Sequence, residues 1–260
     1  MKQMIEAEWK VLVRRSSARG LLLVSALLPI LTALMLGAIS GSDLTFNGQP
    51  VSEVFSFSGP HTATLALRVR HALFLPIFIL FVTGSSFATE RANHMWRERL
   101  VRPASRDSML MSKIVALLLL CGVSLVLNAV MSISLGTILM GTDGPWGMVL
   151  LGHMISLCTD LGLIALASLL STMCRSGAMV VVSGILIYLS DQAVNAALFL
   201  VGMAGVDGTA LVQQFLPSTG WNLWTMMLGD SGWSPALNLV VWTTLFLALA
   251  RHRLNRTDIP

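Results

Sequence analysis

Charged residues are scarce in this chain of 260 residues. Asp, Glu, Lys and Arg make up 12% of the sequence, whereas a soluble domain contains roughly 25%. The mean hydropathy of +0.76 comes from long apolar runs separated by short charged stretches, a pattern typical of a polytopic α-helical membrane protein. It excludes an ordinary soluble domain. It also excludes a transmembrane β-barrel, whose strands alternate over segments of about ten residues.

Several motifs are absent as well. The three cysteines, Cys121, Cys158 and Cys174, show no CxxC spacing, so neither a disulfide framework nor a metal site follows. No Gly-Lys dipeptide occurs, and hence no GxxxxGK(S/T) loop that would bind nucleotide phosphates. If this chain pumps a substrate with ATP, another subunit must therefore bind the nucleotide.

Six apolar runs predict transmembrane helices. The fourth and fifth runs each contain one aspartate, Asp160 and Asp191. We therefore predict an all-α polytopic membrane domain without a separate soluble domain. The predicted spans are residues 20–40, 72–89, 114–141, 145–173, 176–206 and 235–250.

The positions of the cations predict the orientation of these spans. If both termini are cytoplasmic, 15 of the 17 Lys and Arg residues fall on the cytoplasmic side, and only Arg68 and Arg70 fall outside. The positive-inside rule therefore favours cytoplasmic termini. Because the cations flank the apolar runs, we expect the lipid bilayer as their partner and no nucleic acid.

Residues 1–19 have the pattern of an amphipathic helix that precedes the first span. Their apolar residues recur at i, i+4, i+7 and i+8, namely Ile5, Trp9, Leu12 and Val13. Charged residues follow one another at four-residue spacing on another face, namely Glu6, Lys10 and Arg14. We favour a helix that lies in the membrane interface over a simple extension of the first span.

The largest charged segment, residues 90–113, lies between the second and third spans. Pro103 disfavours helical geometry at the residue before it, so a short helix should end there, and Ser105 should cap the next helix. The short helix has Trp96 and Leu100 on one side. The segment therefore either forms a cytoplasmic helix that inserts into a groove of another protein, or it is a solvated loop that only connects the two spans.

This segment carries a resemblance to a known family. A glutamate after the second span leads to a Pro-x-Ser-Arg turn and to a lysine that opens the third span; these are Glu90, Pro103, Ser105, Arg106 and Lys113. Together with the N-terminal amphipathic helix and the six spans, they make the chain similar to the permease subunits of type-2 ATP-binding-cassette (ABC) exporters. The resemblance covers essentially all of the chain and is closest to the short drug- and peptide-efflux permeases.

The resemblance implies partners and a location. In such exporters two permeases, which are copies of one chain or close homologues, pair with two cassette ATPases that bind ATP and Mg. The permease itself holds no cofactor, and the expected location is the inner (cytoplasmic) membrane of a bacterium. The charged segment would be the coupling helix that contacts the ATPase. The implied coupling residues are Glu90, Arg91, Trp96, Arg97, Glu98, Arg99, Leu100, Pro103, Ser105 and Arg106.

The two intramembrane aspartates need an explanation, because a carboxylate near the bilayer centre costs about 2.5–3.5 kcal/mol on insertion scales. Asp160 and Asp191 lie 15 and 16 residues from the turn at Arg175. At 1.5 Å per residue this is about 22–24 Å, so we expect similar depth on neighbouring helices. Tyr188 and Asn195 share the face of Asp191. This face either lines a cavity or meets a partner.

Polar residues in the third predicted span and before the second one can also be interpreted as structural or as functional. For the face of the third span that carries Asn128, we favour interhelical hydrogen bonds over a cavity. Arg68, Arg70 and His71 precede the second predicted span; they either pair with one of the aspartates, attract an anionic group, or extend to the interface, which we favour. The candidate residues of a translocation path are Tyr188, Asp191, Asn195, Asp160, Asn128, Arg68 and Arg70.

Three functions compete for these features. An intramembrane aspartyl protease needs a carboxylate pair, but neither aspartate lies in a GxGD context. An ion-coupled carrier or channel would use Asp160 and Asp191 but gives segment 90–113 no purpose. We therefore predict an exporter permease that is coupled to separate ATPases. Residues 207–234 are expected at the outer face, as an interfacial loop or as the re-entrant helices that the resemblance implies.

Overall fold

Helices dominate the structure. The computed structural model describes residues 2–42, 45–46, 49–50, 58–92, 105–222 and 234–256. Among these residues, five helices are long and apolar enough to cross a membrane, and a sixth span results if the bent pair α4 and α5 counts as one. The prediction of an all-α membrane protein is therefore confirmed. The spans are α2 (Ser16–Ser40), α4 (Gly59–Val69) with α5 (Leu75–Ala92), α7 (Arg106–Met140), α8 (Trp146–Met173), α9 (Gly177–Met203) and α13 (Ser234–Arg256).

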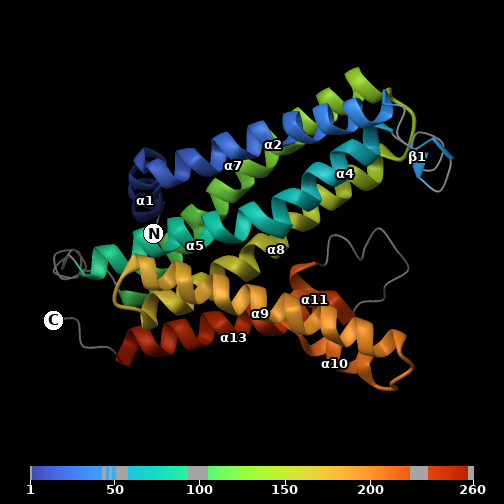
Figure 1. The fold of residues 1–260 in the computed structure, drawn as a ribbon. Coiled ribbons are helices and arrows are strands. Elements are labelled where there is room, and N and C mark those ends of the chain that lie inside the picture. The colour runs from blue at the N-terminus through green and yellow to red at the C-terminus, as the bar shows by residue number, and fades with distance from the viewer. Residues whose placement is uncertain are drawn as a thin grey trace.

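The shorter elements lie at the two ends of this bundle (Figure 1). At one end, called the basal end below, lie α1 (Lys2–Arg14), the last turns of α5 and α13 and the first turn of α7. At the distal end lie two antiparallel strands, β1 (Thr45–Phe46) and β2 (Gln49–Pro50), and two short helices, α10 (Thr209–Phe215) and α11 (Pro217–Trp221). The described part of the predicted outer segment therefore contains helices.

Helix α1 is separate from the first span. The chain adopts an extended conformation at Arg15, and Figure 1 shows α1 at an angle to α2. Glu6 and Lys10, which share the predicted charged face, form an ion pair at i,i+4, with 2.8 Å between Glu6 Oε1 and Lys10 Nζ. Leu12 is buried, and α1 packs on α7. The prediction of a distinct amphipathic helix is thus preferable to an extension of the first span.

The second span begins earlier than the apolar run suggested. Ser58 caps α4 by accepting a hydrogen bond from the main-chain nitrogen of His61. The helix therefore begins at Gly59, thirteen residues before the predicted start at 72. A π-helical turn, η1 (Arg70–Phe74), joins α4 to α5 at a bend of 44°. Arg70 and His71 are therefore buried within the span, and the expectation that they extend to the interface was wrong. Arg68 is exposed.

Helix α8 forms the centre of the bundle. Its most apolar window is 61% buried, against 22% for the corresponding windows of α9 and α13, so most of α9 remains available to lipid or to another chain. α8 packs on α13, α5 and α7, whereas α9 packs mainly on α5. Gly184 of α9 lies so close to Leu80 of α5 that any side chain at that glycine would overlap the leucine. A small residue is therefore required at this helix crossing.

Candidate functional site

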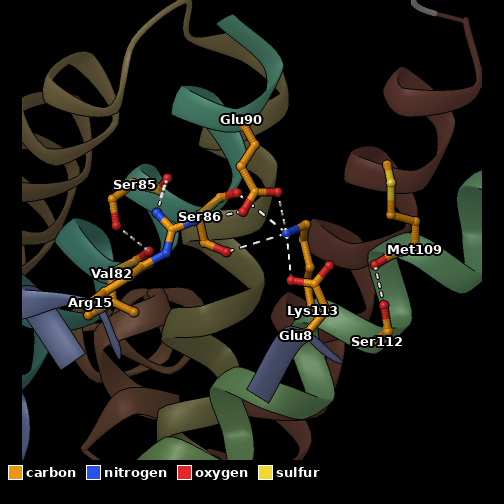
Figure 2. Close-up of polar contacts among 9 residues, drawn as sticks. All are labelled: Glu8, Arg15, Val82, Ser85, Ser86, Glu90, Met109, Ser112 and Lys113. Atoms are coloured by element: carbon orange, nitrogen blue, oxygen red, sulfur yellow. Dashed lines mark hydrogen bonds and ion pairs between the residues drawn. The ribbon is translucent and has the colours of Figure 1, made fainter. Parts of the chain in front are cut away.

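Four charged side chains form a buried group at the basal end, called the basal cluster below: Glu8, Arg15, Glu90 and Lys113. The ammonium nitrogen of Lys113 lies 2.7 Å from Glu90 Oε2 and 2.9 Å from Glu8 Oε2. Arg15 Nη2 donates to the other carboxylate oxygen of Glu90 at 2.6 Å. Figure 2 shows Lys113 between the two carboxylates and Arg15 on the other side of Glu90. Two positive and two negative formal charges therefore balance within the cluster.

Further contacts hold the two cations of the basal cluster. Arg15 Nη1 donates to the carbonyl oxygen of Ser85 at 2.6 Å. Lys113 Nζ donates to the carbonyl oxygen of Ser86 at 3.4 Å and lies 5.4 Å from the centroid of the Phe87 ring, a distance at which a cation and an aromatic face attract each other. Only 1% of the Lys113 side chain is exposed. Loss of one partner from such a buried pair leaves an uncompensated charge, which typically costs about 3–5 kcal/mol.

The basal cluster joins separate parts of the chain. Glu8 lies on α1, Arg15 at the break between α1 and α2, Glu90 in the last turns of α5, and Lys113 near the start of α7. Glu90 also lies just before residues 93–104, the part of the predicted coupling segment between α5 and Ser105. The helix that leads into this part is therefore bound to the N-terminal helix and to the third span.

The residues that follow 93–104 are bound to the bundle as well. Ser105 caps α7, as predicted, because its Oγ accepts a hydrogen bond from a main-chain nitrogen at 3.1 Å. Asp107 makes a two-pronged pair with Arg251 of α13, at 3.0 and 2.6 Å. Arg106 Nη1 donates to two carbonyl oxygens in the last turn of α13, at 3.0 and 3.1 Å. The exit from the segment is thus tied to the last helix.

The predicted coupling residues fall into two groups. Glu90 belongs to the basal cluster, and Ser105 and Arg106 begin α7. Arg91 belongs to α5, but its side chain lies outside the described part of the chain. Also outside the described residues lie Trp96, Arg97, Glu98, Arg99, Leu100 and Pro103.

A second buried group, called the inner cluster below, lies at the π-helical turn: Arg70, His71 and Asp160. Arg70 Nη2 lies 3.0 Å from Asp160 Oδ2, and the exposed fractions of the two side chains are 2% and 0%. Arg70 Nη1 lies 3.1 Å from His71 Nε2. The sequence left open whether Arg70 pairs with Asp160 or with Asp191, and in the structure it pairs with Asp160. Because π-helical turns are frequent at functional sites, this bend is a second candidate site.

The remaining candidate residues of the translocation path are dispersed. Asn128 Nδ2 of α7 donates to the carbonyl oxygen of Ser25 on α2 at 3.3 Å, so its side chain makes an interhelical hydrogen bond, as favoured. Tyr188 Oη donates to the carbonyl oxygen of His71 at 3.2 Å, which links α9 to the inner cluster. Asn195 lines a groove of about 740 Å³ at the distal end.

The two intramembrane aspartates have different surroundings. Asp160 is held by Arg70, whose guanidinium lies 3.0 and 3.4 Å from its two oxygens. Asp191 is half-buried and faces Ser218 of α11. Within the part of the chain that the structure describes, neither aspartate contacts a second carboxylate of the kind that an aspartyl protease needs. Among the described residues, no group of three or more His, Cys, Asp or Glu side chains comes together in a way that would hold a metal ion.

Comparison with known proteins identifies the family. The family model described as "ABC-2 family transporter protein" matches residues 4–186, which is more than half of the chain. The chain belongs to the ABC-2 transporter family. It is therefore a membrane permease of this family, as the resemblance of the sequence predicted. No curated protein matches it. Both the basal and the inner cluster of this ABC-2 permease lie within the matched residues.

Sequence reasoning missed two members of the basal cluster, Glu8 and Arg15. A signal for Glu8 was present, because it lies four residues before Leu12 and so shares the buried face of α1. A carboxylate on such a face requires a buried partner. That partner, Lys113, was noted only as part of the family pattern.

Proposed function

We propose that this ABC-2 permease is the membrane-spanning subunit of an ATP-driven exporter, that two permeases form the translocation path, and that separate cassette ATPases drive it. The observation that carries the proposal is that the described residues on both sides of 93–104 are bound to the bundle. The basal cluster binds the entry, and the pair between Asp107 and Arg251 binds the exit. A displacement of this segment by an ATPase would therefore reach α1, α7 and α13 together.

The low burial of α9 supports the dimer. Its most apolar window is only 22% buried within one chain, which leaves a long face for a second permease. Six spans are also few for a complete alternating-access carrier built from internal repeats. A translocation path shared between two permeases accounts both for the low burial of α9 and for the small number of spans.

An ion-coupled carrier is less consistent with the structure than an exporter. A carrier of this kind would need an aspartate that ions or protons reach. Asp160 is fully buried and is held by Arg70, so its charge already has a partner. Only Asp191 remains as a half-exposed carboxylate. In the exporter, the basal cluster connects the proposed coupling segment to the bundle. A carrier without an ATPase does not need such a connection.

The first test is to purify the tagged permease gently from its native membrane and to identify stoichiometric partners by mass spectrometry. The proposal expects a cassette ATPase at one copy per permease. Recovery of the permease without an ATPase, and without any nucleotide-dependent activity after addition of membrane extract, would favour the carrier.

A second test addresses the coupling segment itself. Replacing Glu98 and Arg99 together by alanine should weaken attachment of the ATPase or its stimulation by the permease. The matched control replaces Glu6 and Lys10 by alanine, because these residues form an exposed ion pair on α1 outside the segment. Unchanged stimulated hydrolysis and transport in the first variant would refute the assignment of the segment.

A further inference from the structure

An apolar groove follows α7 from the level of α1 toward the middle of the span. Its first part, of about 610 Å³, lies between the two helices and is lined by Lys2, Ile5, Glu6, Trp9, Leu119 and Val123. Its second part, of about 490 Å³, is lined by residues of α7 and by Leu157 of α8. The two parts share Leu119 and Val123, so they adjoin and form one groove.

The length of the groove matches one leaflet of a bilayer. Its lining on α7 extends from Val115 to Leu127, which corresponds to about 18 Å of helix. The hydrocarbon core of a bilayer is about 30 Å thick, so one leaflet contributes about 15 Å. Val115 follows Lys113 by two residues, and Lys113 contacts Glu8 of α1. The groove therefore starts close to the level at which Glu8 of α1 contacts α7 and runs along α7 for about the depth of one leaflet.

The mouth of the groove carries a cation, and its wall is apolar. Lys2 is exposed and lines the part of the groove that adjoins α1, called its mouth, together with Trp9 and at the level of Leu119 and Val123 of α7. A cation beside a tryptophan suits the head-group region of a membrane. Glu6 also lines the mouth, but its carboxylate is paired with Lys10 at 2.8 Å. A phosphate group would therefore meet the Lys2 ammonium without an opposing free carboxylate.

Gly122 keeps the middle of the groove open. A β-carbon built there would meet only Leu157 Cδ1, at 3.9 Å, so the space beyond the glycine is not filled by a neighbouring helix. Leu119 and Val123 on either side are 50% and 42% exposed. The groove thus has room for a flexible hydrocarbon chain along α7.

We propose that this groove binds one phospholipid with an anionic head group, whose acyl chain lies along α7 past Gly122 and whose phosphate contacts Lys2. The lipid would connect α1 to α7 and α8 through the membrane interface. This binding is independent of the ATPase and of the transported substrate.

The test measures lipid retained by the purified permease in micelles that contain equal amounts of phosphatidylglycerol and phosphatidylcholine, by native mass spectrometry. The wild type should retain one phosphatidylglycerol per chain. Gly122→Phe should lose it, because the ring occupies the groove, whereas Gly147→Phe should retain it, because Gly147 is exposed and has open space around it outside the groove. Lys2→Gln should bind both lipids equally.

Three results would overturn the proposal: retention of phosphatidylglycerol by Gly122→Phe at the wild-type level, no preference between the two lipids in the wild type, or dissociation of a permease dimer by Gly122→Phe, which would make the groove a contact between copies. If Gly122→Phe does not fold, quenching by phosphatidylglycerol with a brominated acyl chain provides a second measurement. The wild type should lose more tryptophan fluorescence than Trp9→Phe, and equal losses would also overturn the proposal.

Discussion

The two buried charge clusters of this ABC-2 permease stabilise different features of the fold: contacts between helices in one case and a bend within one span in the other. The basal cluster takes its charges from α1, the break after α1, α5 and α7, and therefore binds separate helices to one another. The inner cluster has two consecutive residues, Arg70 and His71, in one π-helical turn and one partner on α8. It therefore holds a bend within a single span. One cluster is suited to pass on a displacement, and the other to preserve a shape.

Their exposure to solvent differs too. In the basal cluster Lys113 is 1% exposed but Arg15 is 23% exposed, whereas in the inner cluster Arg70 and Asp160 are 2% and 0% exposed. A charge that loses its partner in the inner cluster has no access to water, and it destabilises the fold more strongly as a result. The effects of mutation should therefore decrease from the inner cluster to the basal cluster and then to the exposed pairs.

The largest effect is expected for Arg70→Met. This change leaves the Asp160 carboxylate buried without its partner, and it should lower the free energy of unfolding by about 3–5 kcal/mol. Unfolding of the purified permease with denaturing detergent measures the change. Addition of Asp160→Leu should restore most of the lost stability, since an apolar pair can replace a buried ion pair. A double variant less stable than Arg70→Met would contradict this account of the inner cluster.

A somewhat smaller effect is expected for Lys113→Met in the basal cluster. Arg15 still compensates Glu90 in this variant, so the loss of stability should be near the lower end of the same range, about 3 kcal/mol. Stimulation of the ATPase by the permease should also fall, because the ion pairs that join Glu8 of α1 and Glu90 of α5 to α7 are lost. Lys10→Met, in an exposed pair, is the matched control. Equal losses in both variants would show that burial of the cluster has no special importance.

Arg251→Ala should separate coupling from stability. Its pair with Asp107 is exposed, and exposed pairs contribute little to stability. The midpoint of unfolding should therefore stay within the error of the measurement. ATPase stimulation should decrease, because only the hydrogen bonds of Arg106 then tie α13 to the start of α7, where the proposed coupling segment ends. A parallel loss of folding and stimulation would remove this distinction.

The smallest effect concerns pH and the pair between Glu6 and Lys10. The Lys10 ammonium holds the pKa of Glu6 below its ordinary value of 4.5, through a hydrogen bond and charge attraction. A lowered pKa in the folded state means that the pair stabilises α1 above pH 4.5 and that this contribution is lost as the pH falls through the folded-state pKa. Hydrogen exchange of α1 above and below pH 4.5 should show this change, and Glu6→Gln should abolish it.

Much of the fold follows from local patterns. The apolar runs predict the spans because a segment in the bilayer must satisfy its backbone N–H and C=O groups internally, which a helix does. The start of α7 was predicted from Ser105, whose capping bond involves a residue three positions away. The separate amphipathic helix α1 follows from spacing within thirteen residues. In each case the interaction that decides the structure lies within one or two helical turns.

The parts that were missed depend on distant partners. Arg70 lies among apolar residues but is charged, so the second span was expected to begin after it; its burial depends on Asp160, 90 residues away. Glu8 binds Lys113 across 105 residues, and no local spacing reveals that contact. Individual charged residues in predicted spans therefore indicate that a partner exists but not which residue it is.

The π-helical turn at Arg70 also affects the register of the second span. Such a turn amounts to one extra residue within an α-helix, and each residue advances the direction of the side chains by about 100°. Consequently α4 faces chiefly α7 and α2, whereas α5 faces chiefly α9 and α8. Removal of one residue between 70 and 74 would rotate the whole of α5 against α4 and carry Glu90 away from Lys113. The direction in which the end of α5 faces, just before the proposed coupling segment, is thus set by one extra residue deep in the bundle.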